Sequence, residues 1–283
     1  MRIWILGSGS RGNALVVESG HDRILVDAGF PARTLAKRMQ SVGVEPESIA
    51  HCLVTHEHQD HCRGAGVAAR RWGWELHATA GTLAACPDLA GATLSVVSAG
   101  TPMRFGALEV TALRTPHDAA ESIALHIMAT TTGVRAGLAY DLGSVPESLC
   151  TALADVDILV AESNHDMAML RNGPYPRVVQ DRIASRTGHL NNQASGEFVR
   201  RCVGRRGASV VLAHISEKCN APAVAHAAVS DALRGERFRG SLAVAAQDHV
   251  IGPVEPGSRR WTPGAGAAAG VGVGAPRQLE FGL

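Results

Sequence analysis

The chain of 283 residues is poor in several features, and each scarcity excludes a class of protein. Aromatic residues make up only 4%, so the core must consist mainly of alanine, valine, leucine and isoleucine. No apolar run approaches the roughly 18 residues that a membrane helix needs, and the apolar run at residues 1–7 is too short for a signal peptide. These absences predict a soluble, cytoplasmic protein with no membrane partner.

Neither sign of charge is in excess, and the cysteines form no recognisable pairs. The 27 basic and 26 acidic side chains leave a net charge of +1, which argues against a strongly basic nucleic-acid binder but allows a local positive groove. The six cysteines are irregularly spaced and include no Cys-x-x-Cys pair, which is typical of the reduced thiols of a cytosolic protein.

What the sequence does contain indicates one folded unit followed by a tail. Hydrophobic residues make up 46% and charged residues 19%, which excludes a fully disordered chain. Residues 1–252 alternate apolar runs with helical patterns, so we expect one domain there. Residues 253–283 are rich in glycine, alanine and proline and are predicted to form a disordered tail, the alternative being an extension that docks on a partner.

The apolar patterning predicts strands in two groups, each closed by helices. Short β-branched or apolar runs indicate strands at 2–6, 14–18, 23–27, 52–55, 108–113, 122–128, 134–140, 158–161 and 209–213. Helical spacing indicates helices at 34–42, 64–72, 192–203 and 221–233, and Ser144 to Glu147 has the form of a capping box. Two sheets packed together, with helices outside, are therefore expected.

The N-terminus contains a motif that imitates a dinucleotide-binding loop. Residues 7–12 match G-x-G-x-x-G after a predicted strand, and Asp27 follows 20 residues after the first glycine. Only nine residues separate Gly12 from Asp22, too few for a crossover helix, so no nucleotide cofactor is expected. The loop could instead bind phosphate or bond only within itself, and its candidate groups belong to Ser8, Ser10, Arg11 and Asn13.

Histidine is abundant, with 13 residues, and the strongest motif is His56-Glu57-His58-Gln59-Asp60-His61 after a predicted strand. On extended backbone, His56 and His58 point the same way and could hold one ion, while Asp60 and His61 could hold a second. Two metals about 3.5–4 Å apart can deprotonate a shared water and bind a scissile phosphoryl or acyl group. The zincin motif H-E-x-x-H is absent because residue 60 is aspartate. The alternative is a solvated polar loop.

Further candidate ligands stand where other predicted strands end. His117 lies between two strands, and Asp141 and His214 each follow an apolar strand directly. Each alone would be a polar loop residue, but their repeated placement favours a metal site. His165 is not expected to be a ligand, because the other candidates already fill the site. No sequence context supports a role for His21, His51, His77 and His249.

The pattern H-x-H-x-D-H with ligands at strand ends resembles the metallo-β-lactamase superfamily. More closely, the chain resembles the bacterial exonuclease family called WalJ-like or YycJ-like. The segments that carry this resemblance are 6–13, 55–61, 117–121, 161–166, 169–176, 188–190 and 213–216. The first pattern identifies only the superfamily, whereas Asn164-His165-Asp166 together with residues 171–176 is more specific.

The resemblance implies the fold, the cofactors and the reaction. The fold class implied is α/β (α+β), a four-layer αββα sandwich. Two divalent metal ions per chain, Zn²⁺ or Mn²⁺, are implied, together with hydrolysis of DNA from a 5′ end through a metal-bridging hydroxide. The implied ligands are His56, His58 and His117 for one ion and Asp60, His61 and His214 for the other, with Asp141 bridging and Asp27 orienting ligands by hydrogen bonds.

A carboxylate–imidazole pair is predicted beside the metals. Glu162 ends a strand and His189 precedes a helix start. In related nucleases of the superfamily a Glu–His pair helps to protonate the leaving oxygen, and the alternative here is a structural hydrogen bond. Asp60, His189 and Glu162 are thus the expected catalytic residues.

A second candidate substrate-binding segment follows the 164–166 motif. Arg171 matches phosphate geometry, Tyr175 can stack on a base or pack in the fold, and Asn172 lies between them. The chain departs from the family at 188–191, which ends in asparagine where serine is frequent, and at 218–220, where acidic or amide residues are commoner. Both departures leave the substrate less certain.

Two other functions remain alternatives. A small-molecule hydrolase of the same fold would act on a thioester, lactone or cyclic phosphodiester. A non-catalytic module with structural zinc would have a closed mononuclear site, which conflicts with the number of candidate ligands.

Overall fold

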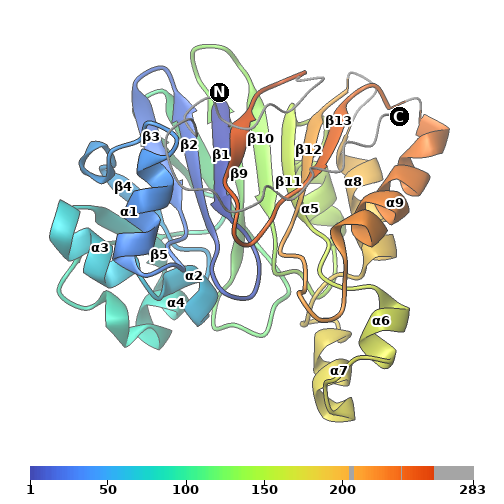
Figure 1. The fold of residues 1–283 in the computed structure, drawn as a ribbon. Helices are drawn as coiled ribbons and strands as arrows, with labels where there is room; N and C mark the ends of the chain where they lie inside the picture. The colour runs from blue at the N-terminus through green and yellow to red at the C-terminus, as the bar shows by residue number, and fades with distance from the viewer. Residues whose placement is uncertain (204–206, 237, 258–283) are drawn as a thin grey trace, which may run out of the picture.

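The computed structural model describes residues 1–203, 207–236 and 238–257. Two β-sheets lie face to face with helices on their outer surfaces (Figure 1). This arrangement confirms the four-layer αββα sandwich. Most of the tail predicted at 253–283 lies outside the described residues, and the described strand β14 crosses the boundary predicted at residue 252.

The described part of the first sheet has seven strands in the order β14-β1-β2-β3-β4-β5-β6. Their bounds are β1 Arg2–Gly7, β2 Ala14–Ser19, β3 Asp22–Val26, β4 His51–Leu53, β5 Glu75–Thr79, β6 Thr93–Val97 and β14 Ile251–Val254. The residues after Gly12 form strand β2 and a turn into β3, with no crossover helix. The glycine-rich loop therefore leads into a β-hairpin, where the dinucleotide-binding motif has a crossover helix.

The second sheet, as far as described, also has seven strands, in the order β13-β12-β11-β10-β9-β8-β7. Their bounds are β7 Pro102–Phe105, β8 Leu108–Arg114, β9 Ile123–Ala129, β10 Arg135–Ala139, β11 Ile158–Glu162, β12 Ser209–Ala213 and β13 Ser241–Val244. β10 to β13 are mutually parallel, as are β3 to β6 in the first sheet. In such sheets ligand sites form outside the carboxyl ends of the strands.

Helices lie on both outer faces of the sandwich (Figure 1). Those on the side of the first sheet are α1 Ala32–Gln40, η1 Pro46–Ser48, α2 Gln59–Cys62, α3 Ala65–Trp72, α4 Ala80–Ala85 and η2 Pro87–Leu89. Those of the second half are α5 Glu147–Ala152, α6 Met167–Arg171, α7 Arg177–Ile183, α8 Asn192–Cys202, α9 Pro222–Leu233 and η3 Arg234–Glu236. No helix within the described ranges combines the length and apolarity needed to cross a membrane.

Three apolar clusters hold the four layers together. Alternation along β1 sends Ile3 and Ile5 into the cluster between the sheets, and Trp4 and Leu6 into the cluster beneath α1 and α3. A third cluster, which includes the buried Phe198, packs the second sheet against α5, α8 and α9. All six cysteines are buried and free.

The helix predicted after Ser144 begins differently from the expected capping box. Pro146 is the N-cap of α5 with extended backbone, and no side chain caps the helix. Because the helix starts at Glu147, Ser144 lies two residues before the N-cap, and its hydroxyl donates instead to the carbonyl oxygen of Arg186 at 3.1 Å. The capping-box prediction was wrong, whereas the prediction of a helix here is confirmed.

Candidate metal centre

Histidine and aspartate side chains from both sheets meet at the carboxyl ends of the strands. His56 follows β4, Asp141 follows β10 and His214 follows β12, while His117 lies in the loop between β8 and β9. The short helix α2 and its N-cap residue His58 supply the remaining groups. The residues that the structure brings together here are His56, His58, Asp60, His61, His117, Asp141 and His214.

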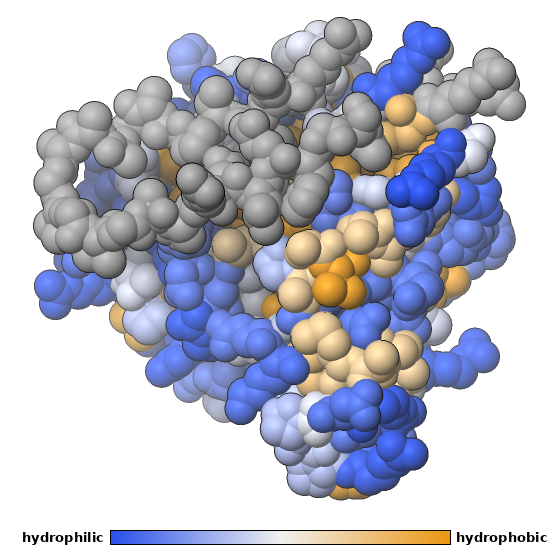
Figure 2. Space-filling view, turned by 45° about the vertical axis from the view of Figure 1, so that its right-hand side comes forward, coloured by the Kyte–Doolittle hydropathy of each residue, from blue (hydrophilic) through white to orange (hydrophobic). Residues whose placement is uncertain are grey.

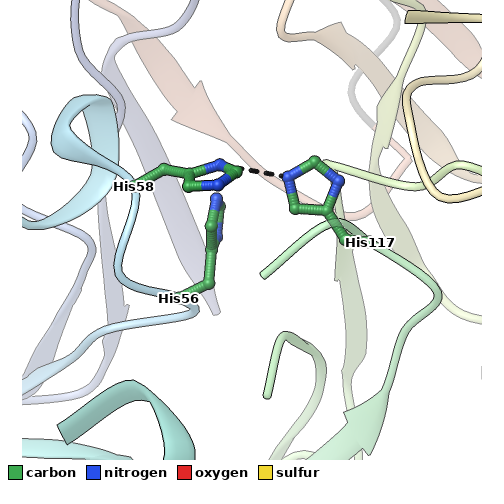
Figure 3. Close-up of side chains that lie close together, drawn as sticks. All are labelled: His56, His58 and His117. Carbon is green, nitrogen blue, oxygen red and sulfur yellow. Dashed lines mark hydrogen bonds between the residues drawn. The ribbon is translucent and has the colours of Figure 1, made fainter. Parts of the chain in front are cut away.

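The first group consists of three histidines. The Nε2 atom of His117 lies 3.2 Å from Nδ1 of His58, and one ring nitrogen from each of His56, His58 and His117 falls within 4.8 Å of the others. Figure 3 shows the three imidazole rings converging from two separate loops. Three nitrogens at this spacing form one face of a possible coordination shell for a divalent ion.

The second group adds carboxylates. Oδ2 of Asp60 lies 3.2 Å from Nε2 of His214 and 3.4 Å from Nε2 of His61. Asp141 stands between the groups, because its Oδ2 lies 2.8 Å from Nε2 of His61 and 3.9 Å from Nε2 of His56. A carboxylate in this position could touch ions in both groups.

Polar atoms without partners indicate that these groups suit a cation. Nε2 of His56 is buried and forms no hydrogen bond, and Oδ2 of Asp141 forms none either despite lying 2.8 Å from Nε2 of His61, although buried polar groups are nearly always paired. Burial, followed by the charge of His61, holds the pKa of His56 well below its usual value, so its imidazole is neutral. Burial would raise the pKa of Asp141, but the charges of His214 and His61 hold it well below its usual value. Neutral imidazoles and ionised carboxylates are ligands for Zn²⁺, and carboxylates also suit Mn²⁺.

Asp27 fixes the orientation of one imidazole. This fully buried carboxylate lies with Oδ2 2.8 Å from Nδ1 of His61 and accepts hydrogen bonds from the hydroxyls of Tyr140 at 2.7 Å and Thr55 at 2.9 Å. Its Oδ1 accepts from the backbone N–H of Thr55 at 2.8 Å. Nδ1 of His61 is therefore occupied, and its Nε2 is directed toward Asp141.

Removing one of these orienting contacts provides a test. We expect Tyr140→Phe to lower the affinity of the centre for zinc by less than the roughly 10–100-fold typical of direct hydrogen-bond partners of metal ligands, because Tyr140 acts on His61 through Asp27. The measurement is competition with a chelator of known affinity. Tyr175→Phe is the matched control, since Tyr175 lies outside this hydrogen-bond network; equal affinities of the two variants would contradict the expected role of Tyr140.

The backbone is strained at three of these strand ends. Asp27, Asp141 and His214 have φ values of 59°, 58° and 53°, in the left-handed region that non-glycine residues rarely adopt. Close approach also requires Gly29, because a Cβ there would lie 1.7 Å from the carbonyl oxygen of Asp60. The loop after β3 thus packs directly on the helix that carries Asp60 and His61.

A buried glutamate holds a histidine beside the centre. Oε1 of Glu162 lies 2.7 Å from Nδ1 of His189, and its Oε2 accepts from the backbone N–H groups of Leu142 at 2.8 Å and Leu190 at 3.1 Å. Nδ1 of His189 is also 3.2 Å from Oδ1 of Asp141. Burial alone would lower the pKa of His189, but the charge of Glu162 and the hydrogen bonds to both carboxylates raise it to about 10. The pair can therefore present a proton at the rim of the centre.

The N-terminal loop lies against the ligand helix. Ser8 and Asn13 are buried; the Ser8 hydroxyl donates to Oδ1 of Asn13 at 2.8 Å, and Nδ2 of Asn13 lies 3.3 Å from Oδ2 of Asp60 and 3.1 Å from Nε2 of His61. Ser10 and Arg11 are exposed, and Arg11 pairs with the carboxylates of Glu217 and Asp248. Direct substrate contact by this loop stays a prediction.

The other predicted substrate-binding residues lie on a protruding arm formed by α6, α7 and the segment between them (Figure 1). Arg171 pairs with Asp181 at 2.6 Å, and Tyr175 lies beneath the ammonium of Lys218, 6.0 Å from its ring centroid. The Asn172 amide donates to the carbonyl oxygen of Ala168, at 2.9 Å. Arg182 ties the arm to the centre by donating to Asp118, the neighbour of His117, at 2.5 Å.

The supporting roles of several residues were not identified from the sequence. Thr55 and Tyr140 bind Asp27, Asn164 donates its amide to the backbone oxygen of His214 at 3.1 Å, and Glu57 accepts from the N–H of Ala120 at 2.6 Å. Tyr140 and Thr55 each stand next to a predicted ligand, which is the signal that could have identified them. His165 is absent from every ligand group found among the described residues.

Comparison with known proteins identifies the family and the fold. Residues 22–215 match the family model described as the β-lactamase superfamily domain. The chain is 32% identical over 240 residues to exodeoxyribonuclease YycJ of Bacillus anthracis, covering 83% of this chain and 89% of that protein. It is 30% identical over 228 residues to exodeoxyribonuclease WalJ of Streptococcus pneumoniae strain D39, covering 78% and 84%.

A solved structure shows the same fold at lower sequence identity. Zinc-bound PqqB from Methylobacterium extorquens superimposes with a TM-score of 0.65 at 17% identity, covering 89% of this chain and all of that one.

Proposed function

The chain belongs to the β-lactamase superfamily, as a hydrolase of the metallo-β-lactamase fold, and we propose that it is a metal-dependent 5′-exodeoxyribonuclease. The observation that carries the proposal is the Glu162–His189 pair, 2.7 Å apart and adjoining the seven candidate ligands through Asp141. Relatives at 30–32% identity that are named exodeoxyribonucleases support the same substrate.

The candidate ligands would hold two ions. His56, His58 and His117 would bind one, Asp60, His61 and His214 the other, and Asp141 both. When bound, divalent ions such as Zn²⁺ or Mn²⁺ supply positive charge to phosphate oxygens and acidify water. Asp27 keeps Nε2 of His61 available by engaging its Nδ1, and the Asn13 amide orients Asp60 by donating to its Oδ2.

His189 would transfer a proton to the leaving oxygen. Its Nδ1 faces Glu162, so Nε2 is the atom left to face the substrate. Two backbone N–H groups hold Glu162 in place, and its charge favours the protonated imidazole before transfer. A protonated imidazole in this position would donate a proton directly to the departing oxygen, so that the oxygen leaves as an alcohol without a proton from solvent.

The arm would bind the DNA strand. Residues 171–186 contain four arginines and one aspartate, although the whole chain carries a net charge of only +1. Hydrophilic side chains gather at the lower end of the molecule, where Figure 1 draws α6 and α7 (Figure 2). Arg171 would contact phosphate, Tyr175 would stack on a base and Asn172 would bind an edge or a phosphate. Ser10 and Arg11, in the N-terminal loop, are exposed candidates for further contacts with the DNA.

The proposal is tested by measuring hydrolysis of a 5′-phosphorylated DNA duplex and of a thioester by one purified sample whose metal content is also determined. We expect shortening of DNA from the 5′ end, about two ions per chain and no thioester turnover. Thioester turnover without DNA cleavage would overturn the nuclease proposal and assign a small-molecule hydrolase to the same centre. One ion that cannot be removed without unfolding, and no turnover of either substrate, would indicate a structural metal.

The arm provides a narrower prediction. Because each neutralised phosphate of duplex DNA contributes about 0.9 to the slope of log affinity against log salt, Arg171→Ala should reduce that slope by about 1. The measurement is the affinity for DNA at salt concentrations from low to physiological, in buffers that contain calcium. Arg104→Ala, which removes an exposed arginine from β7, is the control for loss of charge alone. An unchanged slope in Arg171→Ala would contradict phosphate contact by this residue.

A further inference from the structure

Two histidines and a glutamate meet at the other end of the first sheet. His51 is the first residue of β4, whereas His56 of the candidate centre follows the carboxyl end of that strand. Glu75 and His77 lie on the neighbouring strand β5, where His51 is in register with Glu75 and Leu53 with His77. The two imidazoles flank Phe105 of β7, with ring centroids 4.9 Å from it in each case.

The three possible ligand atoms form a triangle of the size that a tetrahedral ion requires. Nδ1 of His51 lies 3.0 Å from Nε2 of His77, and Oε2 of Glu75 lies 3.4 Å from the first atom and 3.7 Å from the second. Zinc bonds of about 2.0–2.2 Å at tetrahedral angles place neighbouring ligand atoms about 3.3–3.6 Å apart. An ion at bonding distance from all three atoms therefore fits with shifts of a few tenths of an ångström.

The surroundings prepare these atoms for a metal. The Ser95 hydroxyl donates to Oε1 of Glu75, which orients the carboxylate and leaves Oε2 free. This hydrogen bond lowers the pKa of Glu75, and burial lowers the pKa of His77, so the carboxylate is charged and the imidazole neutral. The hydrogen bond between the imidazoles needs only a tautomer change to release both lone pairs.

Solvent can reach a fourth position. The side chains of His51 and Glu75 are 32% and 34% exposed, while that of His77 is only 8% exposed. An ion would therefore be anchored from inside by His77 and would face water on its outer side. Three protein ligands with one open position is an established zinc geometry.

We propose that Nδ1 of His51, Oε2 of Glu75 and Nε2 of His77 form a mononuclear Zn²⁺ site, separate from the candidate centre, that links β4 to β5. A set of two imidazoles and one carboxylate binds zinc in preference to magnesium or calcium. The competing arrangement is a metal-free relay in which Glu75 and the two histidines bond only to one another.

The experiment is calorimetric titration of chelator-treated, metal-free protein with zinc chloride alone. Wild type should take up one more ion per chain than Glu75→Gln and His51→Ala. His21→Ala, at an exposed turn, and Glu109→Gln, on β8, are matched controls and should take up as many ions as wild type. The comparison is a difference between variants, so it is independent of how many ions the candidate centre binds.

Cobalt provides a second readout. The difference spectrum between Co²⁺-loaded wild type and Co²⁺-loaded Glu75→Gln should show the intense visible bands of a four-coordinate ion. Circular dichroism tests whether each variant is folded. If His51→Ala is unfolded, the test rests on the isosteric Glu75→Gln. Equal zinc stoichiometry in wild type and Glu75→Gln, with no cobalt difference spectrum, would overturn the proposal and leave the metal-free relay.

Discussion

Replacing Asp60 with asparagine is expected to lower kcat for DNA hydrolysis by about 10³-fold or more, equivalent to about 4 kcal/mol of lost transition-state stabilisation. Oδ2 of Asp60 lies 3.2 Å from Nε2 of His214 and 3.4 Å from Nε2 of His61, so it is the negative group of its ligand set. Burial would raise the pKa of Asp60, but His61 and His214 hold it below its usual value, so the carboxylate is charged. Asparagine preserves the shape and removes the charge.

Steady-state hydrolysis of a 5′-phosphorylated duplex and metal analysis of the same samples provide the measurement. The number of bound ions should fall from about two to about one, because His56, His58 and His117 remain. Gln59→Ala is the matched control, since Gln59 is the exposed neighbour of Asp60 in α2. An Asp60→Asn enzyme with wild-type kcat and two ions would contradict the ligand assignment.

His189→Gln is expected to lower kcat on DNA by about 10²–10⁴-fold, the usual contribution of a general acid. The effect should depend on the leaving group, because Nε2 of His189 is proposed to protonate the departing oxygen. When a nitrophenyl phosphodiester is hydrolysed, the nitrophenolate leaves as a stable anion and needs no proton. The variant should therefore lose less than about tenfold in kcat on that substrate.

Glu162→Gln tests the contribution of the carboxylate charge to protonation. Glutamine keeps one oxygen that can accept from Nδ1 of His189, but its NH2 group cannot accept from the backbone N–H groups of Leu142 and Leu190 as Oε2 does. It also lacks the charge that, together with Asp141, raises the pKa of His189 to about 10. Its loss of kcat should show the same dependence on leaving group as His189→Gln, and the two losses should not add. Equal losses of both variants on DNA and on the nitrophenyl ester would assign the pair a structural role.

The central parts of the fold were predictable because their patterns are local. Residues 2–6 and 209–213 are apolar runs of strand length, and both are buried strands in the structure. The edge strands β6 and β7 escaped prediction because their side chains are largely exposed and show no clean alternation. Helices α6 and α7 are short and flank a glycine- and proline-containing segment, so tertiary contacts decide their existence.

For the candidate centre, the sequence showed which residues could meet but not how they are held. Candidate ligands were recognisable because each stands just after a strand, and parallel strands end at one edge. Tyr140 supplies a hydrogen bond to Asp27 across 113 positions of sequence, which no local pattern encodes. His51 and His77 had no context for the same reason, because they become neighbours only through the register of β4 and β5.

The left-handed backbone at Asp27, Asp141 and His214 has a consequence for the evolution of this fold. A non-glycine residue in that region costs of order 1 kcal/mol or more, whereas glycine adopts it freely. Activity and stability therefore make opposite demands on these three positions. In a pseudoenzyme descended from this protein, released from the need to hold metal, glycine should accumulate at these strand ends, and its presence there would identify a copy that has lost catalysis.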